Sequence, residues 1–430
     1  MENESNVSVP LVRADYMRDT LGYSGSGIKI GMIEGGLPDR NQSYFTTANI
    51  IYDPTAVAER SYGENEETHA NQVAAIMVAK STTVNGVTYC GIVPDATLYA
   101  TCYSNYYGYE WRQGIEWLLS QGVQVINMSA KLNSPDNPPT GEYDSNCRWI
   151  DHVAINHSVH FVKAAGNEGG YVSSPGLSYN AIVVGNLNDN NTLSYEDDNI
   201  WDSSNYLERA ANGITPTNKP DLVAPGTNIN TAVNIQLDDQ KTGTSYSAPH
   251  VTAIIAQLCQ RHPTLKTKQD AMKAILTASI NHKKHAYTRS DTNYDKYGAG
   301  MIDARSAAYT ANAGRFISSS FAANTAESTS KTYTFTVTSS DEKIRISLAW
   351  LKYATISGTH ANTTNPTNVA LADLDLYVYD PNGSLVGSSV SLYNNVEIIQ
   401  INNPVAGTYT IEVDHHAGSP NTVYFGLAWW

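Results

Sequence analysis

Two patterns of apolar and polar residues divide the chain at about residue 314. Before that point, short apolar runs typical of buried strands alternate with segments whose apolar residues recur at helical spacing. Strands are predicted at 27–34, 97–103, 123–129, 159–166 and 181–187, and helices at 70–80, 111–122 and 147–157. Strands that alternate with helices form a parallel sheet that is covered by helices on both faces.

Beyond residue 314 the apolar residues alternate with polar ones over short runs. The runs are 331–339, 343–350, 373–388, 395–401, 407–413 and 422–430, and Pro-Asn-Gly, Asn-Asn and Pro-Val-Ala-Gly turns lie between them. This pattern predicts an antiparallel β-sandwich. We therefore expect an α/β domain of residues 1–314, followed by an all-β sandwich domain of residues 315–430 that packs directly against it.

Length, composition and charge narrow the class of protein. A chain of 430 residues is long enough for two domains, and 41% hydrophobic with 16% charged residues indicates a folded protein. The net charge of -14 argues against binding to nucleic acid, which needs basic patches. No apolar run spans a bilayer and no signal peptide is visible. We expect a secreted protein in its mature form, with a cytoplasmic protein as the alternative.

The four cysteines indicate neither a zinc site nor a disulfide framework. Cys90, Cys102, Cys147 and Cys259 are too widely spaced for a zinc site, and Cys259 lies in an apolar run where a buried thiol is ordinary. A Cys90–Cys102 disulfide is compatible with the spacing. The redox compartment stays open.

The segment KTGTSYSAPHVTAIIAQLCQ, residues 241–260, carries the first candidate for chemistry. A Gly-Thr-Ser turn opens an apolar helix, and Pro249 is expected in its first turn, where a missing N–H is tolerated. Ser245 would stand at the positive end of that helix, where the dipole and backbone N–H groups favour a developing negative charge. An N-cap serine is the structural alternative.

Three further polar residues lie at predicted element ends. Glu34 ends the first strand, His69 stands just before a helix, and Asn167 follows a buried strand within AAGNEGG. An imidazole acts as a general base, and an amide donates to an oxyanion. In a parallel sheet such groups meet at the carboxyl ends of the strands. Each of them alone also has an ordinary structural explanation.

Taken in order, these segments resemble a known family. MIEGG, THANQVAA, AAGNEGG and GTSYSAPHV are similar to the acid, histidine, amide and serine motifs of the subtilisin-like serine proteases, the subtilases of the peptidase S8 type. The resemblance covers about residues 8–312. The segment DLDLYVYDPNG and the residues after it resemble the β-domain of some bacterial alkaline subtilases.

The resemblance implies a serine endopeptidase that works through an acyl-enzyme on Ser245. His69 would be the base, Glu34 would orient it, and Asn167 would help to bind the oxyanion. Ser129 would form part of a backbone wall for an extended peptide substrate. Subtilases usually have an amino-terminal prodomain, which we expect to be absent from this chain. The alternative is a pseudoprotease that binds peptides or proteins without cutting them.

The motifs also depart from the family pattern. The family's acid is aspartate and this chain has glutamate, whose extra methylene must be accommodated. Lys131 stands where a glycine is usual, so it narrows the cleft, selects acidic substrates or points to solvent. The residues after His69 are Ala70, Asn71 and Gln72 in place of Gly, Thr and His, and we expect them to change packing contacts.

Other candidate residues concern substrate and metal binding. Tyr106 and Tyr107 match a loop that borders the subtilase cleft and would bind apolar side chains, or else form a surface loop. Asp373 and Asp375 share one strand face and would help to hold a structural Ca²⁺, or else form a solvated face. The triplet at 414–416 is not expected to bind a metal, because adjacent strand residues face opposite ways. No cofactor is required for the reaction.

Overall fold

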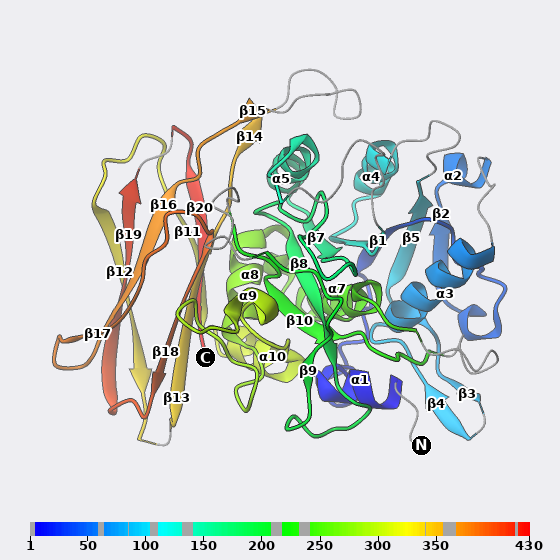
Figure 1. Ribbon diagram of the computed structural model, residues 1–430, viewed down its shortest axis with the longest axis horizontal. Coiled ribbons are helices and arrows are strands. Elements are labelled where there is room, and N and C mark those ends of the chain that lie inside the picture. The colour runs from blue at the N-terminus through cyan, green and yellow to red at the C-terminus, as the bar shows by residue number, and fades with distance from the viewer. Residues whose placement is uncertain are drawn as a thin grey trace.

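The computed structural model describes ten stretches of the chain, and every structural statement below refers to them. They are residues 5–58, 64–84, 86–103, 111–130, 141–207, 217–231, 241–339, 341–355, 367–417 and 420–430. Figure 1 shows an α/β region joined along one side to a pair of β-sheets.

The α/β region is built on one sheet with the order β10-β8-β7-β6-β1-β5-β2, and β9 pairs with β8. Every neighbouring pair along this path is parallel. The strands are β1 (Lys29–Glu34), β2 (Asn49–Tyr52), β5 (Thr97–Cys102), β6 (Val125–Met128), β7 (His160–Ala164), β8 (Ile182–Asn188), β9 (Asn199–Ile200) and β10 (Leu222–Pro225). All five predicted strands are present, and the predicted parallel sheet is confirmed.

Helices cover both faces of this sheet. One apolar cluster joins the sheet to α3 (Glu64–Val78), α7 (Thr244–Arg261) and α8 (Gln269–Ala278). A second cluster, on the other face, joins it to α4 (Trp111–Ser120) and α5 (Ser145–His157). The remaining described elements of this region are α1 (Ser5–Leu11), η1 (Tyr16–Thr20), η2 (Ser43–Phe45), α2 (Pro54–Ala58), β3 (Thr82–Val84), β4 (Val87–Tyr89), η4 (Pro263–Thr267), α9 (Tyr294–Tyr297) and α10 (Ala304–Asn312).

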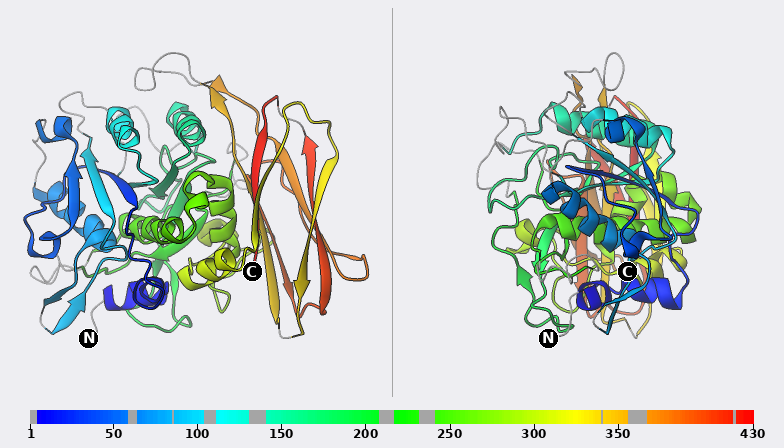
Figure 2. Two further views of the ribbon diagram at one scale, coloured as in Figure 1. Left: turned by 180° about the vertical axis from the view of Figure 1, so that it is seen from behind. Right: turned by 90° about the vertical axis from the view of Figure 1, so that its right-hand side faces the viewer.

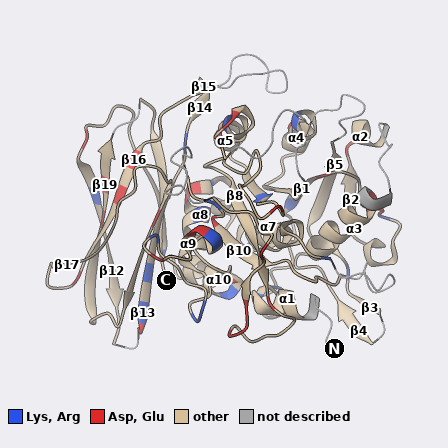
Figure 3. Cartoon of the chain, in the orientation of Figure 1, with Lys and Arg blue, Asp and Glu red and all other residues tan. Residues whose placement is uncertain are grey.

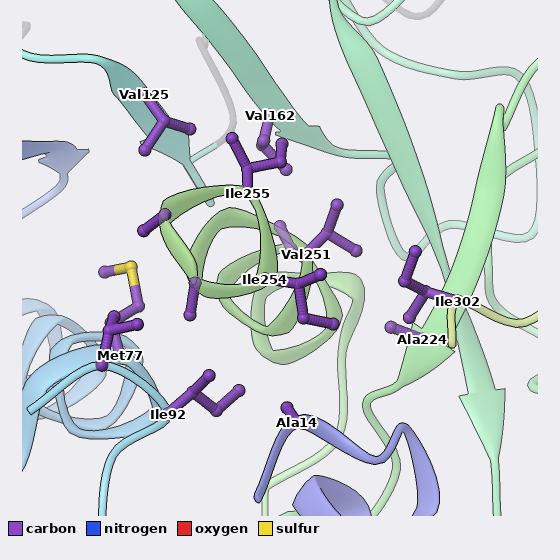
Figure 4. Packing of buried hydrophobic residues seen from close by; sticks show 14 of the residues in the cluster. Ala14, Met77, Ile92, Val125, Val162, Ala224, Val251, Ile254, Ile255 and Ile302 are labelled. Atoms are coloured by element: carbon purple, nitrogen blue, oxygen red, sulfur yellow. The ribbon is translucent and has the colours of Figure 1, made fainter. Parts of the chain in front are cut away.

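Helix α7 runs through the middle of the larger cluster. Figure 4 shows Val251, Ile254 and Ile255 pointing outward from it in different directions, into side chains from the sheet and from the segments around it. These isoleucines and this valine are fully buried. A helix that is apolar on nearly every side must be enclosed, so the position of α7 is fixed by the packing around it.

The second region consists of two four-stranded antiparallel sheets, as predicted for a β-sandwich. The inner sheet has the order β11-β20-β13-β18, and the outer sheet has the order β12-β19-β16-β17. The inner strands are β11 (Phe316–Phe321), β13 (Lys343–Trp350), β18 (Val396–Asn402) and β20 (Val423–Trp429). The outer strands are β12 (Thr329–Val337), β16 (Asp373–Tyr379), β17 (Leu385–Ser389) and β19 (Gly407–Ala417), and a small hairpin joins β14 (Ala354–Thr355) to β15 (Thr367–Asn368).

The inner sheet packs directly on α8 and its neighbours, as the left view of Figure 2 shows. A single apolar cluster contains Ala271 and Ile275 of α8 together with Ile398 of the inner sheet. Gly426 of β20 makes the approach possible, since an added Cβ would lie 2.3 Å from the carbonyl carbon of Asp270. The two regions therefore share part of one core.

Arg345 on β13 also joins the two regions. It is completely buried, and its guanidinium donates to the carbonyl oxygens of Thr277 at 3.1 Å, Ala299 at 3.0 Å and Tyr287 at 2.5 Å. All three acceptors belong to the α/β region. Because a buried cation is stable only when its donors are satisfied, this side chain holds the inner sheet in one place on the α/β region.

The four cysteines are free thiols. The Cys90–Cys102 disulfide that the spacing allows is therefore not formed. Cys102 ends β5, while Cys90 follows the separate β3–β4 hairpin. Among the described helices, none is both long and apolar enough to cross a bilayer.

Candidate active site

Glu34 and His69 meet at the carboxyl edge of the parallel sheet. Glu34 is the last residue of β1 and is 1% exposed. Its Oε2 lies 3.0 Å from Nδ1 of His69 on α3. The glutamate side chain therefore spans the distance to the imidazole, so its extra methylene is accommodated.

The other half of the Glu34 carboxylate has a different environment. Its Oε1 is buried and has no hydrogen-bond partner within the described part of the chain. An unmade hydrogen bond at a buried oxygen costs about 1–3 kcal/mol. The bond to His69 is therefore the main polar contact that holds this carboxylate in place.

His69 lies inside α3, which begins at Glu64. The sequence pattern placed it just before the helix, because apolar helical spacing starts only at Ala70. The first part of α3, before Ala70, shows no apolar spacing because its residues are not in the core: Glu67 and Thr68 are only half-buried. The side chain of His69 is 31% exposed, so the imidazole faces the open edge of the sheet.

Ser245 stands in the first turn of α7 and is paired reciprocally with Ser129, which follows β6. The hydroxyl of Ser245 donates to the carbonyl oxygen of Ser129 at 3.0 Å. The hydroxyl of Ser129 donates to the carbonyl oxygen of Ser245 at 2.9 Å. Two hydrogen bonds thus fasten the start of the helix to the end of the strand.

Pro249 explains why the Ser245 carbonyl is available for this pairing. The helix starts at Thr244, so Pro249 lies in its second turn and not in the first turn as predicted. In a regular helix the N–H of residue 249 would donate to the carbonyl of residue 245. Proline has no N–H, and the hydroxyl of Ser129 supplies the missing donor.

A buried chain of polar groups holds Ser129 itself. The amide of Asn127, in β6, donates to the Ser129 hydroxyl at 2.9 Å. Thr252 on α7 donates in turn to Oδ1 of Asn127 at 3.0 Å. The sequence analysis missed both residues. The only signal that could have found them is a polar side chain in a strand and in a helix that are otherwise buried.

Asn167 lies beside the start of the same helix. Its Oδ1 accepts from the backbone N–H of Thr244 at 2.8 Å and from the Thr244 hydroxyl at 3.0 Å. An added Cβ on Gly243 would lie 3.2 Å from Nδ2 of Asn167, so glycine permits this approach. Because Thr244 uses the oxygen, the exposed amide keeps its N–H₂ group for another acceptor.

The departures after His69 are packing contacts, as the sequence analysis expected. Tyr246 follows Ser245, and its hydroxyl donates to Oε1 of Gln72 at 2.7 Å. Its ring lies 5.6 Å from the ring of His69. Oδ1 of Asn71 accepts from the backbone N–H of Asp39 at 2.7 Å. The tyrosine and the glutamine form a pair behind the imidazole.

His250 of the serine motif has a structural environment. It is fully buried, and its ring nitrogens contact the Tyr246 carbonyl at 2.8 Å and the Ser8 hydroxyl at 3.1 Å. Burial lowers the pKa of His250 to about 4. The imidazole is therefore neutral near pH 7 and serves packing.

Of the remaining predicted site residues, three cannot be placed and two belong to the β-region. Lys131, Tyr106 and Tyr107 fall outside the described residues. Asp373 and Asp375 are on β16 of the outer sheet, so they belong to the β-region and not to the sheet edge that carries Ser245.

Comparisons with known proteins agree with this arrangement. The sequence matches the subtilase family, Peptidase S8, over residues 25–331. The chain belongs to the subtilase family. A second match, to the bacterial pre-peptidase C-terminal domain, covers residues 329–415. This subtilase is therefore a serine protease with an additional β-domain.

Individual relatives are distant. The subtilase is 26% identical over 297 residues to subtilisin E of Bacillus subtilis (strain 168), covering 67% of each chain. It is 28% identical over 291 residues to M-protease of Shouchella clausii (strain KSM-K16), covering 66% of this chain and 65% of the relative. The solved structure of the prenylagaramide maturation protease PagA has a TM-score of 0.48 and 18% identity, and covers 68% of this chain and 96% of its own. At that score the last likeness supports no conclusion.

Proposed function

We propose that this subtilase is an endopeptidase that hydrolyses peptide bonds through an acyl-enzyme on Ser245, with glutamate as the acid of its triad. The observation that supports the proposal is the distance of 3.0 Å between Glu34 Oε2 and His69 Nδ1. A carboxylate at that nitrogen holds the proton on Nδ1, so Nε2 of the neutral imidazole is an acceptor. That is the tautomer that a general base for a serine requires.

The reaction then proceeds in two halves. The Ser245 hydroxyl turns from the Ser129 carbonyl towards His69, gives its proton to Nε2 and attacks the peptide carbonyl carbon. The imidazolium, stabilised by Glu34, gives that proton to the leaving amine as the C–N bond breaks. A water molecule attacks the acyl-enzyme in the same way, releases the carboxyl product and restores the Ser245 hydroxyl.

Two donors would stabilise the tetrahedral oxyanion. They are the Asn167 amide, whose oxygen is already held by Thr244, and the backbone N–H of Ser245 at the positive end of α7. The edge beside Ser129 would bind an extended substrate by strand addition. An extended substrate fits a protease that cleaves within unfolded or flexible segments.

Active-site labelling tests the proposal. A fluorophosphonate reagent should label Ser245 in wild-type protein, and Ser245→Ala should remove both the labelling and the hydrolysis of casein. Ser247→Ala is the matched control, since this serine is on the same helix and is fully buried, so labelling should persist. Folded protein that does not react would refute the proposal.

A pseudoprotease is the second candidate, and one observation favours it. The Ser245 hydroxyl donates to the Ser129 carbonyl, so it is engaged away from the imidazole. Hydroxyl rotation is rapid, and hydrogen bonds at catalytic sites often tighten only when substrate binds. Binding of a casein peptide without its cleavage, by protein that is folded by circular dichroism, would establish the pseudoprotease.

Other sequence predictions stay predictions. These are secretion, the prodomain, a structural Ca²⁺ at Asp373 and Asp375, and the domain boundary at residue 314. Fractionation of a producing culture tests secretion. Limited proteolysis of the Ser245→Ala protein tests the boundary, because cleavage in exposed linkers releases stable domains.

A further inference from the structure

Asp375 and Asp414 lie directly opposite each other on neighbouring strands of the outer sheet. The antiparallel register of β16 and β19 pairs them, and residues paired in this way place their side chains on the same face. His416 stands two positions after Asp414, so it belongs to that face too, whereas His415 points to the other. Of the triplet 414–416, the rule that adjacent strand residues face opposite ways therefore excludes only His415 from a shared metal site.

The ladder between β16 and β19 has a β-bulge at His416. Asp373 pairs with Ala417 and Leu374 pairs with His415, so His416 has no partner across the ladder. Bulges re-aim side chains. Nδ1 of His416 lies 3.8 Å from Asp375 Oδ2 and 4.0 Å from Asp414 Oδ2. One ligand atom from each of these three residues lies within 4.8 Å of the other two.

Asp373 is a neighbour of this group. It stands two residues before Asp375 and so shares its face of β16. Asp373 is 7% exposed, and its Oδ1 has no hydrogen-bond partner within the described part of the chain. Its carboxylate is not among the three groups whose ligand atoms lie within 4.8 Å of one another, so it adds negative charge near the cluster without being a ligand.

The two carboxylates of the cluster and the neighbouring Asp373 repel one another, and each is partly removed from water. An exposed imidazole is a weak counter-charge, since the side chain of His416 is 56% exposed. The Tyr377 hydroxyl donates to Asp375 Oδ2 at 3.2 Å, which orients that carboxylate without neutralising it. Figure 3 shows acidic residues on both strands.

We propose that Asp375, Asp414 and His416 bind a divalent transition metal ion of the Zn²⁺ type, which ties β16 to β19. Imidazole combined with carboxylate suits zinc, whereas calcium takes six to eight oxygen ligands. Three side chains and one water molecule complete the four-coordination of zinc, whose bonds of about 2.0–2.2 Å place ligand atoms about 3.3 Å apart. His416 Nδ1 now lies 3.8 and 4.0 Å from the two carboxylate oxygens, and small side-chain rotations would shorten these distances to that value.

The experiment uses the full chain with Ser245→Ala, which prevents self-digestion. Protein stripped with a chelator is titrated with ZnCl₂ and, separately, with CaCl₂ by calorimetry, and is then heated with and without each salt. We expect one Zn²⁺ per chain and a melting temperature raised by about 5 °C when Zn²⁺ exceeds its Kd 100-fold. Zn²⁺ binding should weaken when the pH is lowered far enough to protonate the ligand carboxylates, because a protonated carboxyl group does not bind the metal.

Two variants and one control assign the site. His416→Ala and Asp375→Asn should each weaken Zn²⁺ binding at least tenfold, while His157→Ala, which removes an exposed imidazole from α5, should leave it unchanged. The proposal is overturned if Zn²⁺ does not bind, if His416→Ala has no effect, or if Ca²⁺ raises the melting temperature more than Zn²⁺ does. The readout is independent of proteolysis, so failure here leaves the proposed function untouched.

Discussion

The carboxyl edge of the parallel sheet and the contact between the two regions both bury polar groups, but they satisfy them differently. At the contact, Arg345 donates from Nε and Nη2 to three backbone carbonyls and from Nη1 to Oε1 of Gln400 at 3.4 Å. The amide of Asn180 donates to the Lys352 carbonyl and accepts from the Lys352 N–H. At the sheet edge, Glu34 Oε1 has no partner and the Asn167 N–H₂ group faces no acceptor within the described residues.

This difference distinguishes the contact between the two regions, which we call the joint, from the candidate reaction site at the sheet edge. Buried groups with complete hydrogen bonding fix one arrangement, and removing any of them leaves another unpaired. Groups with unused capacity cost stability but are available to a substrate. The contact between the regions should therefore govern unfolding, and the sheet edge should govern catalysis.

The largest effect is expected at Glu34. Glu34→Gln keeps the shape but loses the charge that holds His69 in its tautomer, so kcat should fall by about 10⁴. The kcat of Glu34→Asp should fall less than that of Glu34→Gln, because aspartate keeps the negative charge, although farther from His69. Steady-state hydrolysis of a casein peptide measures both. Equal activities of the wild type and Glu34→Gln would show that this carboxylate does not serve the reaction.

Substitution of Asn167 tests whether its unused N–H₂ group takes part in the reaction. Asn167→Ala should lower kcat by about 10²–10³, the contribution of a subtilisin oxyanion donor, with little change in KM. It should also leave the N–H of Thr244, a fully buried residue, without its side-chain acceptor. Asn167→Asp is the matched variant, since it keeps the acceptor and loses the donor. A rise in KM at constant kcat would place Asn167 in substrate binding instead.

Arg345 tests the joint. Arg345→Met keeps much of the side-chain volume but removes the donor from the carbonyl oxygens of Thr277 and Tyr287, while the Ala299 oxygen still accepts from the Tyr287 N–H at 3.0 Å, so the free energy of unfolding should fall by about 3 kcal/mol. Urea denaturation measures this loss, and kcat of the folded protein should stay unchanged. Arg305→Met, at an exposed position whose guanidinium lies 4.9 Å from the centre of the Tyr16 ring, is the control and should change stability by less than about 0.5 kcal/mol.

The contact also has exceptions. Arg289 Nη1 and Glu397 Oε1, 3.7 Å apart across it, have no hydrogen-bond partner within the described residues. Neither ring nitrogen of His282 has one there either. Its ring stacks on Trp430 at 3.5 Å, and burial, with Arg345 next in effect, lowers its pKa from 6.5 to about 2. The unfolded chain binds this proton below pH 6.5 and the folded chain does not, so stability is lost as the pH falls from 6.5 towards 2.

A variant isolates that pH dependence. His282→Phe keeps the stacking and removes the titration, so at pH 5 it should gain about 2 kcal/mol relative to its effect at pH 8. Urea denaturation of both proteins at the two pH values gives the difference. A difference that does not change with pH would mean that His282 is protonated in the folded protein.

The sequence predicted the elements because those depend on local pattern, and it proposed the site residues, whose roles stay predictions, from ordered motifs. Apolar runs locate β1 and β6, and the order of Glu34, His69, Asn167 and Ser245 follows from motifs. The Ser129–Ser245 pairing, the Tyr246–Gln72 pair and the β-bulge at His416 were not predicted. Each depends on how residues distant in the sequence come into register, which the spacing along one strand or helix does not contain.

The reciprocal bonds between Ser129 and Ser245 also bear on inactivation by heat. Because the Ser129 hydroxyl replaces the donor that Pro249 lacks and the Ser245 hydroxyl bonds back to Ser129, the proposed nucleophile stays in place while strand and helix stay packed. In enzymes whose sites loosen first, activity is lost before the protein unfolds. Here we expect activity and folded structure to be lost together. Residual activity and tertiary circular dichroism, followed together on heating, should decay along one curve.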